Sequence, residues 1–480
     1  MKQVKVASIK TNFIYNTAYQ IMAIVVPLIT TPYLSRVLGA EYIGIFSYAF
    51  SVVYYFGLFA MLGVNNYGNR SIAAIRDDED ARSKTFWSIY FFQIVTSLMM
   101  FVLYVMYIAI LCDDKTIGWI MIPYIISCGL DINWFFFGIE QFKLTTIRNI
   151  FIKIFSIVGI FIFVKKPTDV YLYALIYVLS QFLSQVILWV SIGKYVRKCK
   201  IHFSDITQHI KPNIILFIPL LAISLYKIMD KIMLGAIVSK VEVGYYESSE
   251  RVIQVPVALI NSLGTVMLPR ISNLIANNER KQSEKYLRKS ISFAMFLSFS
   301  MGFGIMAVAK EFVPVFYGQG FEKCVLIFQV LLPSCFFLAF ANVIRTQYLI
   351  PNKMDKEFTV SIITGAMVNF TINLILIPKF ASIGAGVGTL CAEASVCLMQ
   401  CTFVRKKVNL RQYLIDICPF FIAGLVMYFS LQNIVLKNNG LVAIAIKIFL
   451  GIVIYGIVLA MYVLIQKSGR NRSIKITWLL

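Results

Sequence analysis

Long apolar runs alternate with short polar segments along the whole chain, and no polar stretch exceeds about twenty residues. A helix needs about 20 consecutive apolar residues to cross the hydrocarbon core of a bilayer. Measured against that length, the sequence predicts about fourteen transmembrane helices, near residues 11–35, 42–66, 86–111, 117–140, 145–164, 170–193, 212–238, 243–269, 290–309, 324–346, 357–378, 383–404, 413–431 and 441–466. We therefore expect an all-α, polytopic membrane protein without an extramembrane domain.

Composition and charge agree with a membrane protein and narrow its partners. Hydrophobic residues make up 59% of the 480 residues and charged residues 14%, with a mean hydropathy of +0.77, against about 45–50% and about 25% in soluble domains. The formal net charge is +22, but the cations lie in short segments between the apolar runs. That placement is typical of membrane topology and of anionic headgroups, not of nucleic acid. The nine cysteines form no CxxC pair, so we expect no disulfide, metal or other cofactor.

The distribution of Lys and Arg predicts the orientation of the chain. If the N-terminus is cytoplasmic, the fourteen spans place 31 of the 45 cations on the cytoplasmic side and nine on the other. The remaining five lie inside spans: Lys153, Lys227, Lys231, Arg251 and Lys447. Because one miscounted span would invert every later segment and erase the bias, the positive-inside rule supports both the count and two cytoplasmic termini.

Two stretches of the chain resemble each other, which predicts an internal repeat. The first reads "VPLITTPYLSRVLGAEYIGIFSYA" from Val26, and the second reads "IPLLAISLYKIMDKIMLGAIVSKVEVGYYESS" from Ile218. Matching positions are about 200 residues apart, with Pro27 matching Pro219, Gly39 matching Gly235 and Gly44 matching Gly244. Six spans separate the copies, so the expected architecture is two six-helix bundles in parallel orientation, residues 1–200 and 201–410, followed by two further helices in 411–480.

The first copy contains a turn between spans one and two. Arg36 would lie in the last turn of one helix, Gly39 at its C-cap and Glu41 at the start of the next. Each charge is favourable at that helix end. We therefore interpret Arg36 and Glu41 as architectural.

Three segments give the sequence a family resemblance: "PYLSRVLGAEYIGIFSYA" after span one, "MDKIMLG…VGYYESSERV" from Met229 to Val252, and "IGAGVGTLCAE" from Ile383 to Glu393. They resemble the polysaccharide exporters, or O-antigen-type flippases, of the multidrug/oligosaccharidyl-lipid/polysaccharide (MOP) superfamily. The resemblance implies a MATE-like fold in a bacterial cytoplasmic membrane. It also implies translocation of undecaprenyl-pyrophosphate-linked oligosaccharide repeat units for capsule, O-antigen or exopolysaccharide, alongside the polymerase and glycosyltransferases of the same pathway.

Other functions remain open at this stage. A lipid II-type flippase is the second candidate, and a drug/cation antiporter of the same fold is the third, although its cavity would be acidic and such antiporters usually have twelve spans. A membrane glycosyltransferase or polymerase would need catalytic carboxylates or long outer loops, which the sequence does not contain. We therefore expect a transporter and not an enzyme, working by alternating access with bends at Pro27, Pro32 and Pro219.

Span seven carries the strongest candidate substrate site. Lys227, Asp230 and Lys231 lie at positions i, i+3 and i+4, on one face of the helix. Charges inside a membrane usually face a cavity or a partner, so this stripe could bind the pyrophosphate, with Asp230 tempering the charge or coupling to an ion. Alternatively, Asp230 and Lys231 lie near the outer interface, where one pairs and the other snorkels.

The start of span eight adds a second charged group. Glu247 and Arg251 are four residues apart and are expected to pair along the helix. Arg251 could instead face the cavity and bind phosphate with its planar guanidinium. Glu247 and Glu250 could line the cavity, or simply favour the helix N-terminus.

Further intramembrane polar residues are weaker candidates. Asp131 in span four and Lys153 in span five could line the cavity of the first bundle or pair with each other. Glu393 in span twelve is a candidate ion or proton site. Substrate capture at the cytoplasmic mouth could involve Arg70 and Arg345, and the stripe of Asn12, Asn16 and Gln20 fits a cavity lining or interhelical hydrogen bonds.

Two features are discounted. "GAGVG" at 384–388 imitates a nucleotide-binding loop, but it follows a membrane helix and lacks the Walker lysine, so it predicts a closely packed helix start. The only histidines, His202 and His209, fall in a predicted cytoplasmic loop. We therefore expect no histidine proton relay within the bilayer.

Overall fold

The computed structural model describes residues 9–434, 436 and 440–468, and of residues 9–21, 23–24 and 466–468 it describes only the backbone. Most of the described residues are helical, and there is no strand among them. They form two compact units, Met1–Ser224 and Leu225–Leu480. The predicted boundaries at residues 200 and 410 stay a prediction.

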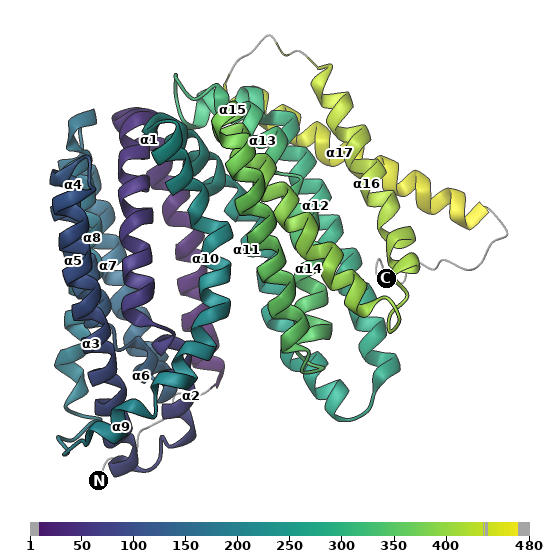
Figure 1. Cartoon of the computed structure of the whole chain (residues 1–480). Helices are drawn as coiled ribbons and strands as arrows, with labels where there is room; N and C mark the ends of the chain where they lie inside the picture. The colour runs from purple at the N-terminus through teal and green to yellow at the C-terminus, as the bar shows by residue number, and fades with distance from the viewer. Residues whose placement is uncertain (1–8, 435, 437–439, 469–480) are drawn as a thin grey trace. The chain divides into compact units, whose positions relative to one another are not determined.

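Unit 1 contains the first half of the chain (Figure 1). Its helices are α1 (Ile9–Met61), α2 (Val64–Ala74), α3 (Glu79–Ile110), α4 (Lys115–Ile120), α5 (Ile122–Gly129), α6 (Asn133–Gly138), α7 (Phe142–Phe163), the 3₁₀ turn η1 (Pro167–Asp169), α8 (Val170–Ile192) and α9 (Phe203–Thr207). Helix α10 (Ile210–Ile237) passes from unit 1 into unit 2.

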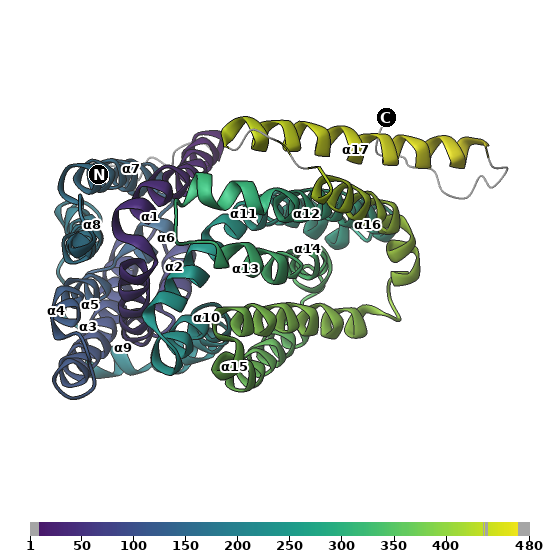
Figure 2. The same ribbon diagram turned by 90° about the horizontal axis from the view of Figure 1, so that it is seen from above.

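Unit 2 contains the remaining elements: α11 (Lys240–Ala276), α12 (Arg280–Phe316), α13 (Lys323–Leu331), α14 (Ser334–Ile344), the π-helical turn η2 (Arg345–Leu349), α15 (Asp355–Val404), α16 (Leu410–Gln432) and α17 (Leu441–Ser468). Within this unit α12 packs against α11, α14 and α16, and α14 packs against α15. Helix α17 runs along α12 and α16 (Figure 2).

Twelve segments of the described chain are long and apolar enough to cross a membrane. Two of them, Val25–Ala74 and Asp355–Val404, have 50 residues each, or about 75 Å at 1.5 Å per residue, which is enough for two crossings of a core about 30 Å thick. Large apolar side chains such as Phe155 and Val190 are more than 80% exposed, as expected where a helix faces lipid. The prediction of an all-α membrane fold with about fourteen spans is therefore confirmed.

The two long helices are each interrupted by one residue with a positive φ. In α1 this residue is Gly39 (φ 73°, ψ 173°), at the predicted turn, where Arg36 Nη1 donates to the carbonyl of Pro32 at 3.0 Å. Glycine adopts this conformation without the penalty that a Cβ imposes. In the second copy of the repeat the turn comes later in the chain. Gly235, which matches Gly39, lies inside α10, and the helix is interrupted only at Val238–Ser239.

The second interruption, at Ala381 of α15 (φ 52°, ψ −129°), is held by a carboxylate. Glu242 Oε2 accepts hydrogen bonds from the Ser382 hydroxyl at 2.5 Å and from the Ser382 N–H at 3.2 Å, while Glu242 Oε1 accepts one from Lys323 Nζ at 2.6 Å. Because an N–H that leaves a helix needs a new acceptor, Glu242 stabilises the break. It also ties α11 to α13 and α15.

The predicted fourth span is not one helix. It divides into α4, α5 and α6, and residues 131–132 between α5 and α6 are not helical. An aromatic core surrounds this break, with Phe86, Trp134 and Phe135 fully buried. Helix α2 packs closely on it, since a Cβ on Gly68 would lie 2.5 Å from Cε3 of Trp134. The continuous apolar pattern did not reveal this interruption.

Candidate functional site

Asp230 is the centre of a buried polar site in unit 2. Its side chain is 1% exposed. Oδ2 accepts hydrogen bonds from the hydroxyls of Tyr246 and Thr389, each at 2.8 Å, and Oδ1 accepts one from Nδ2 of Asn373 at 2.6 Å. The site joins α10, α11 and α15. A carboxylate whose three donors are two hydroxyls and an amide, all neutral, can hold a proton or a small cation.

The packing of α15 on itself brings the amide of this site into place. Gly388 follows the break at Ala381, and a Cβ on Gly388 would lie only 2.0 Å from Oδ1 of Asn373. That Oδ1 is buried and has no hydrogen-bond partner among the described residues. Gly384 is equally constrained, with its Cβ position 2.5 Å from the carbonyl O of Leu376. The interpretation of "GAGVG" as a closely packed segment is confirmed.

A second group of charges lies on α10 and α11, beginning with Lys231, the residue after Asp230. Lys231 Nζ is 2.6 Å from Glu247 Oε2 and 2.8 Å from Glu250 Oε2. Arg251 Nε is 2.8 Å from Glu247 Oε1, which confirms the pair predicted along the helix. The four side chains are 14–22% exposed. Two cations and two carboxylates balance formally, so Lys231 does not belong to a purely cationic stripe. The alternative interpretation, in which one of Asp230 and Lys231 pairs and the other snorkels, is wrong for both residues, because Lys231 pairs with two carboxylates and Asp230 is buried among hydrogen-bond donors.

The third group combines Lys227, Arg345 and Glu393. Glu393 on α15 is 8% exposed and lies within electrostatic range of both cations. Lys227 is exposed on α10, one turn before Asp230, and Arg345 is half-buried at the start of η2. Here the cations outnumber the carboxylate. The sequence had assigned these three residues to separate roles, and the structure brings them together.

Asp131 in unit 1 lies at the break between α5 and α6. Its Oδ1 accepts hydrogen bonds from the backbone N–H of Asn133 at 2.8 Å and from Nδ2 of Asn133 at 2.7 Å. Arg148 Nη2 donates to Oδ1 of Asn133 at 2.9 Å, and its charge lies within range of Asp131. Arg148 is 6% exposed, although it is one of the 31 cations that the sequence analysis counted on the cytoplasmic side.

The remaining predicted residues, Arg70, Lys153 and Asn16, lie in unit 1. Arg70 is exposed on α2, and Lys153 is half-buried on α7. Asn16 lies on the helical backbone of α1, but its side chain is outside the described part of the chain. Their assignment to the substrate site stays a prediction.

His209 is a buried residue that the sequence analysis placed in a loop. It lies between α9 and α10 and is 5% exposed. Its ring nitrogens are 2.8 Å from the Tyr67 hydroxyl and 2.9 Å from the Ser88 hydroxyl. The only sequence signal was the apolar run that begins at Ile210. His209 therefore anchors the start of α10 to α2 and α3.

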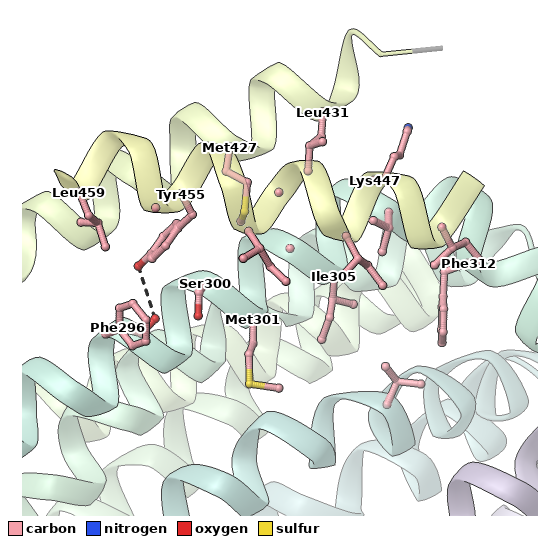
Figure 3. Close-up of a pocket in the computed structure, with 18 residues that line it drawn as sticks. Phe296, Ser300, Met301, Ile305, Phe312, Met427, Leu431, Lys447, Tyr455 and Leu459 are labelled. Atoms are coloured by element: carbon pink, nitrogen blue, oxygen red, sulfur yellow. Dashed lines mark hydrogen bonds between the residues drawn. The ribbon is translucent and has the colours of Figure 1, made fainter. Parts of the chain in front are cut away.

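An apolar cavity of about 570 Å³ lies between α12, α16 and α17 (Figure 3). Its wall is almost entirely hydrocarbon, and its labelled lining residues include Phe296, Met301, Ile305, Met427, Leu431 and Leu459. A hydrogen bond from the Tyr455 hydroxyl to the carbonyl O of Phe296, 3.4 Å long, crosses one end. Lys447 also borders the cavity, and its Nζ pairs with Glu311 Oε1 at 2.6 Å.

Comparisons with known proteins identify relatives of the whole chain. The family model described as "Polysaccharide biosynthesis protein" matches residues 9–275. The "Putative O-antigen transporter" of Escherichia coli (strain K12) is 25% identical over 406 residues, covering 83% of this chain and 97% of that protein. The "Probable low-salt glycan biosynthesis flippase Agl15" of Haloferax volcanii is 22% identical over 52% of this chain and 53% of its own length.

Solved structures share the fold. The "Lipid II flippase MurJ, inward closed conformation" aligns with a TM-score of 0.76 at 17% identity, covering 94% of this chain and 98% of that one. An inward-facing multidrug resistance MATE family transporter of the MOP superfamily aligns with a TM-score of 0.58 at 12% identity, covering 87% and 98% of the respective chains. At these identities the likeness concerns the fold alone, and it confirms the predicted MATE-like architecture.

Proposed function

The chain belongs to the polysaccharide biosynthesis protein family, and on this premise we propose that it is a flippase for oligosaccharides linked to polyprenyl pyrophosphate. It is a multi-pass membrane protein with the fold of the MOP superfamily. Its relatives are named as an O-antigen transporter, a glycan biosynthesis flippase and a capsular polysaccharide biosynthesis protein. These names support transport and not enzymatic catalysis. We assign the chain to the cytoplasmic membrane of a bacterium, with both termini cytoplasmic.

The observation that carries this proposal is the cationic surplus around Glu393. Lys227 is exposed, and Arg345 lies in the same electrostatic neighbourhood within the membrane-spanning part of unit 2. An unpaired charge is costly in hydrocarbon, so two cations beside one carboxylate favour an anionic ligand. A pyrophosphate that is esterified at both ends is dianionic, and it accepts charge-assisted hydrogen bonds from both Lys and Arg. A drug/cation antiporter would need the opposite balance.

Lys231 and Arg251 take a different role in this proposal. Both are already held by Glu247 and Glu250 at 2.6–2.8 Å. Moving either cation to a phosphate would break an ion pair with a carboxylate that is only 14–22% exposed, which is unfavourable. We therefore assign the bound phosphates to Lys227 and Arg345, and the balanced cluster to holding α10 against α11.

Asp230 is proposed as the site that couples transport to an ion gradient. Asp230 lies on α10 and its donors come from α11 and α15, so loading or removing a cation or proton changes the contacts that hold these three helices together. Translocation into vesicles with an imposed sodium or proton gradient tests this assignment. Translocation rates that stay the same whether either gradient is present, reversed or absent would contradict the assignment of Asp230.

The apolar cavity suits the hydrocarbon part of such a substrate. It has the volume of a small-molecule pocket, and it lies among helices that face lipid, with Ile452 and Phe449 of α17 68% and 66% exposed. Its one charged lining residue, Lys447, is paired with Glu311. We propose that part of the polyprenyl chain packs here while the sugar moves, with the rest of the chain in the bilayer.

The test of the function is Lys227→Ala in cells that depend on this protein for a surface polysaccharide. The variant is expected to accumulate lipid-linked repeat units on the cytoplasmic side and to lose surface polymer at least tenfold, because it removes a phosphate contact. Lys165→Ala is the matched control, since Lys165 is an exposed cation between α7 and η1. Normal polymer export by Lys227→Ala, or cation-dependent dye efflux by the wild type, would contradict the proposal.

A lipid II-type flippase is the second candidate function, because its solved example shares the fold with a TM-score of 0.76. The two functions differ in the sugar on the same lipid pyrophosphate. The two candidate functions can be separated by expressing this protein in cells that lack their lipid II flippase. Growth without surface polysaccharide synthesis would favour the second candidate.

A further inference from the structure

The turn η2, Arg345–Leu349, is wound as a π-helix within unit 2. The N–H of Ile350 donates to the carbonyl O of Arg345 at 3.0 Å, which spans five residues where an α-helix spans four. A π-helical turn is rare and occurs frequently at functional sites. It contains one residue more than the α-helical winding that could replace it.

Gln347 in this turn is a buried side chain without partners. It is 0% exposed, and neither Nε2 nor Oε1 has a hydrogen-bond partner among the described residues. Asn342, one turn earlier, donates to Asn261 Oδ1 at 2.6 Å, but its own Oδ1 is also buried without a partner. Buried amides are normally hydrogen-bonded, because desolvation without a partner is costly. The present winding therefore leaves this polar group unsatisfied.

The surroundings of the turn allow it to rewind. Helix α11 approaches it through Gly264, where a Cβ would lie 2.8 Å from Asn342 Oδ1 and 3.1 Å from Thr346 Cγ2. Gly264 itself has no side chain at this contact, and α11 reaches Asn342 through Asn261, one turn earlier. The Thr346 hydroxyl donates to the carbonyl of Asn342 at 2.7 Å. A side-chain hydroxyl therefore already hydrogen-bonds a backbone carbonyl beside the π-helical turn. Rewinding would not have to displace a side chain at Gly264.

Arg345 connects the turn with α15. Its guanidinium carbon is 5.8 Å from the centre of the Phe358 ring, and its charge lies within range of Glu393. Removing one residue from the winding turns the following chain by about 100° and moves it by about 1.5 Å. The position of Arg345 relative to Phe358 and Glu393 therefore depends on how η2 is wound.

We propose that η2 is a two-state joint that passes from π-helical to α-helical winding during transport, and that Gln347 is the positioning residue that gains hydrogen-bond partners in the second state. The joint turns Arg345 relative to Glu393 and so links the state of unit 2 to the occupancy of its cationic site. This role of Arg345 rests on the proposed function. The proposal that η2 has two windings does not depend on that function.

The first experiment replaces Gln347 by Leu, which keeps the volume and removes the amide. In the two-state joint, Gln347→Leu favours the present winding, so the purified protein is expected to melt at a higher temperature while translocation of lipid-linked oligosaccharide falls at least tenfold. Gln400→Leu is the control, because Gln400 of α15 is also buried, with Oε1 unpartnered and Nε2 donating to Ser361 at 3.2 Å. Its translocation is expected to stay within twofold of the wild type.

Hydrogen exchange supplies a measurement that needs no variant. Adding undecaprenyl pyrophosphate to the wild-type protein is expected to change the exchange rates of the amides in 345–350 at least twofold and to leave those of α13 unchanged. A higher melting temperature with wild-type translocation would show a static turn, and a lower melting temperature would show that Gln347 is already hydrogen-bonded, for example to water. Unchanged exchange in 345–350 would also overturn the joint. If the wild type translocates no lipid-linked oligosaccharide, the proposed function fails, and the melting and exchange results still decide whether η2 has two states.

Discussion

Gly388→Ala tests the geometry of the Asp230 site most directly. The new Cβ would lie 2.0 Å from Oδ1 and 2.9 Å from Cγ of Asn373, closer than real Cβ contacts allow. The Asn373 amide would have to move, and it supplies the 2.6 Å hydrogen bond to Asp230 Oδ1. The substitution therefore combines overpacking with the loss of a hydrogen bond to a carboxylate.

The expected magnitude follows from these terms. Overpacking costs about 1–3 kcal/mol, and a hydrogen bond to a charged group contributes about 1.5–3 kcal/mol. Replacing a helical glycine by alanine returns about 0.5–1 kcal/mol through backbone entropy. The net loss in free energy of unfolding is thus about 2–5 kcal/mol. If unit 2, Leu225–Leu480, melts as one cooperative unit, the shift is about 2 °C per kcal/mol, and the melting temperature should fall by at least about 4 °C.

The assay is thermal unfolding of the purified protein in detergent, followed by tryptophan fluorescence. Gly456→Ala on α17 is the matched control, because a Cβ there would meet nothing within 4 Å, so its melting temperature should stay the same or rise. In a double-mutant cycle, Asn373→Ala should absorb most of the cost of Gly388→Ala, since it removes the atoms that clash. Equal melting temperatures for the two glycine variants, or strict additivity in the cycle, would refute the reasoning.

Two further predictions concern the charged cluster and the cavity. Glu247→Ala removes the ion pairs that Lys231 and Arg251 form with Glu247 in a poorly exposed site, and should cost about 3–5 kcal/mol. Glu79→Ala, which breaks the exposed pair with Arg197, should cost no more than about 1 kcal/mol in the same melting assay. Similar losses for both would contradict the burial of the cluster. Gly304→Leu and Gly456→Leu should fill the apolar cavity without destabilising the protein, because their Cβ positions meet nothing closer than 3.8 Å, and translocation should fall severalfold. Full translocation by both variants would exclude the cavity from the path of the lipid chain.

The sequence predicted the features that depend on local patterns. The lengths of the apolar runs predicted about fourteen crossings. The described chain has twelve spanning segments, and the two longest contain one internal break each, which agrees with that prediction. The spacing of Glu247 and Arg251 predicted their ion pair, because residues four apart share a helix face whatever surrounds the helix. The turn at Gly39 was also predicted from local sequence, because a positive φ is a requirement of that one residue.

Features that interrupt an apolar run were missed. The break around Asp131 and the buried Arg148 lie in segments that are apolar enough to suggest one continuous helix or a simple loop boundary. A hydropathy pattern measures the tendency to enter the membrane. It does not measure whether a helix is continuous once there, because neighbouring side chains can satisfy the exposed backbone groups.

What the sequence alone determined is the membrane character of the chain, its family and the charged residues that its spans contain. Only the tertiary structure decided which of these charges are balanced and which remain in surplus. Lys227 and Lys231 share a face of α10, yet Lys231 meets Glu247 and Glu250 of α11, while Lys227 lies near Glu393, which is 166 positions away in the numbering. Helical periodicity fixes the face on which a side chain lies, but the packing of distant helices fixes what that face meets.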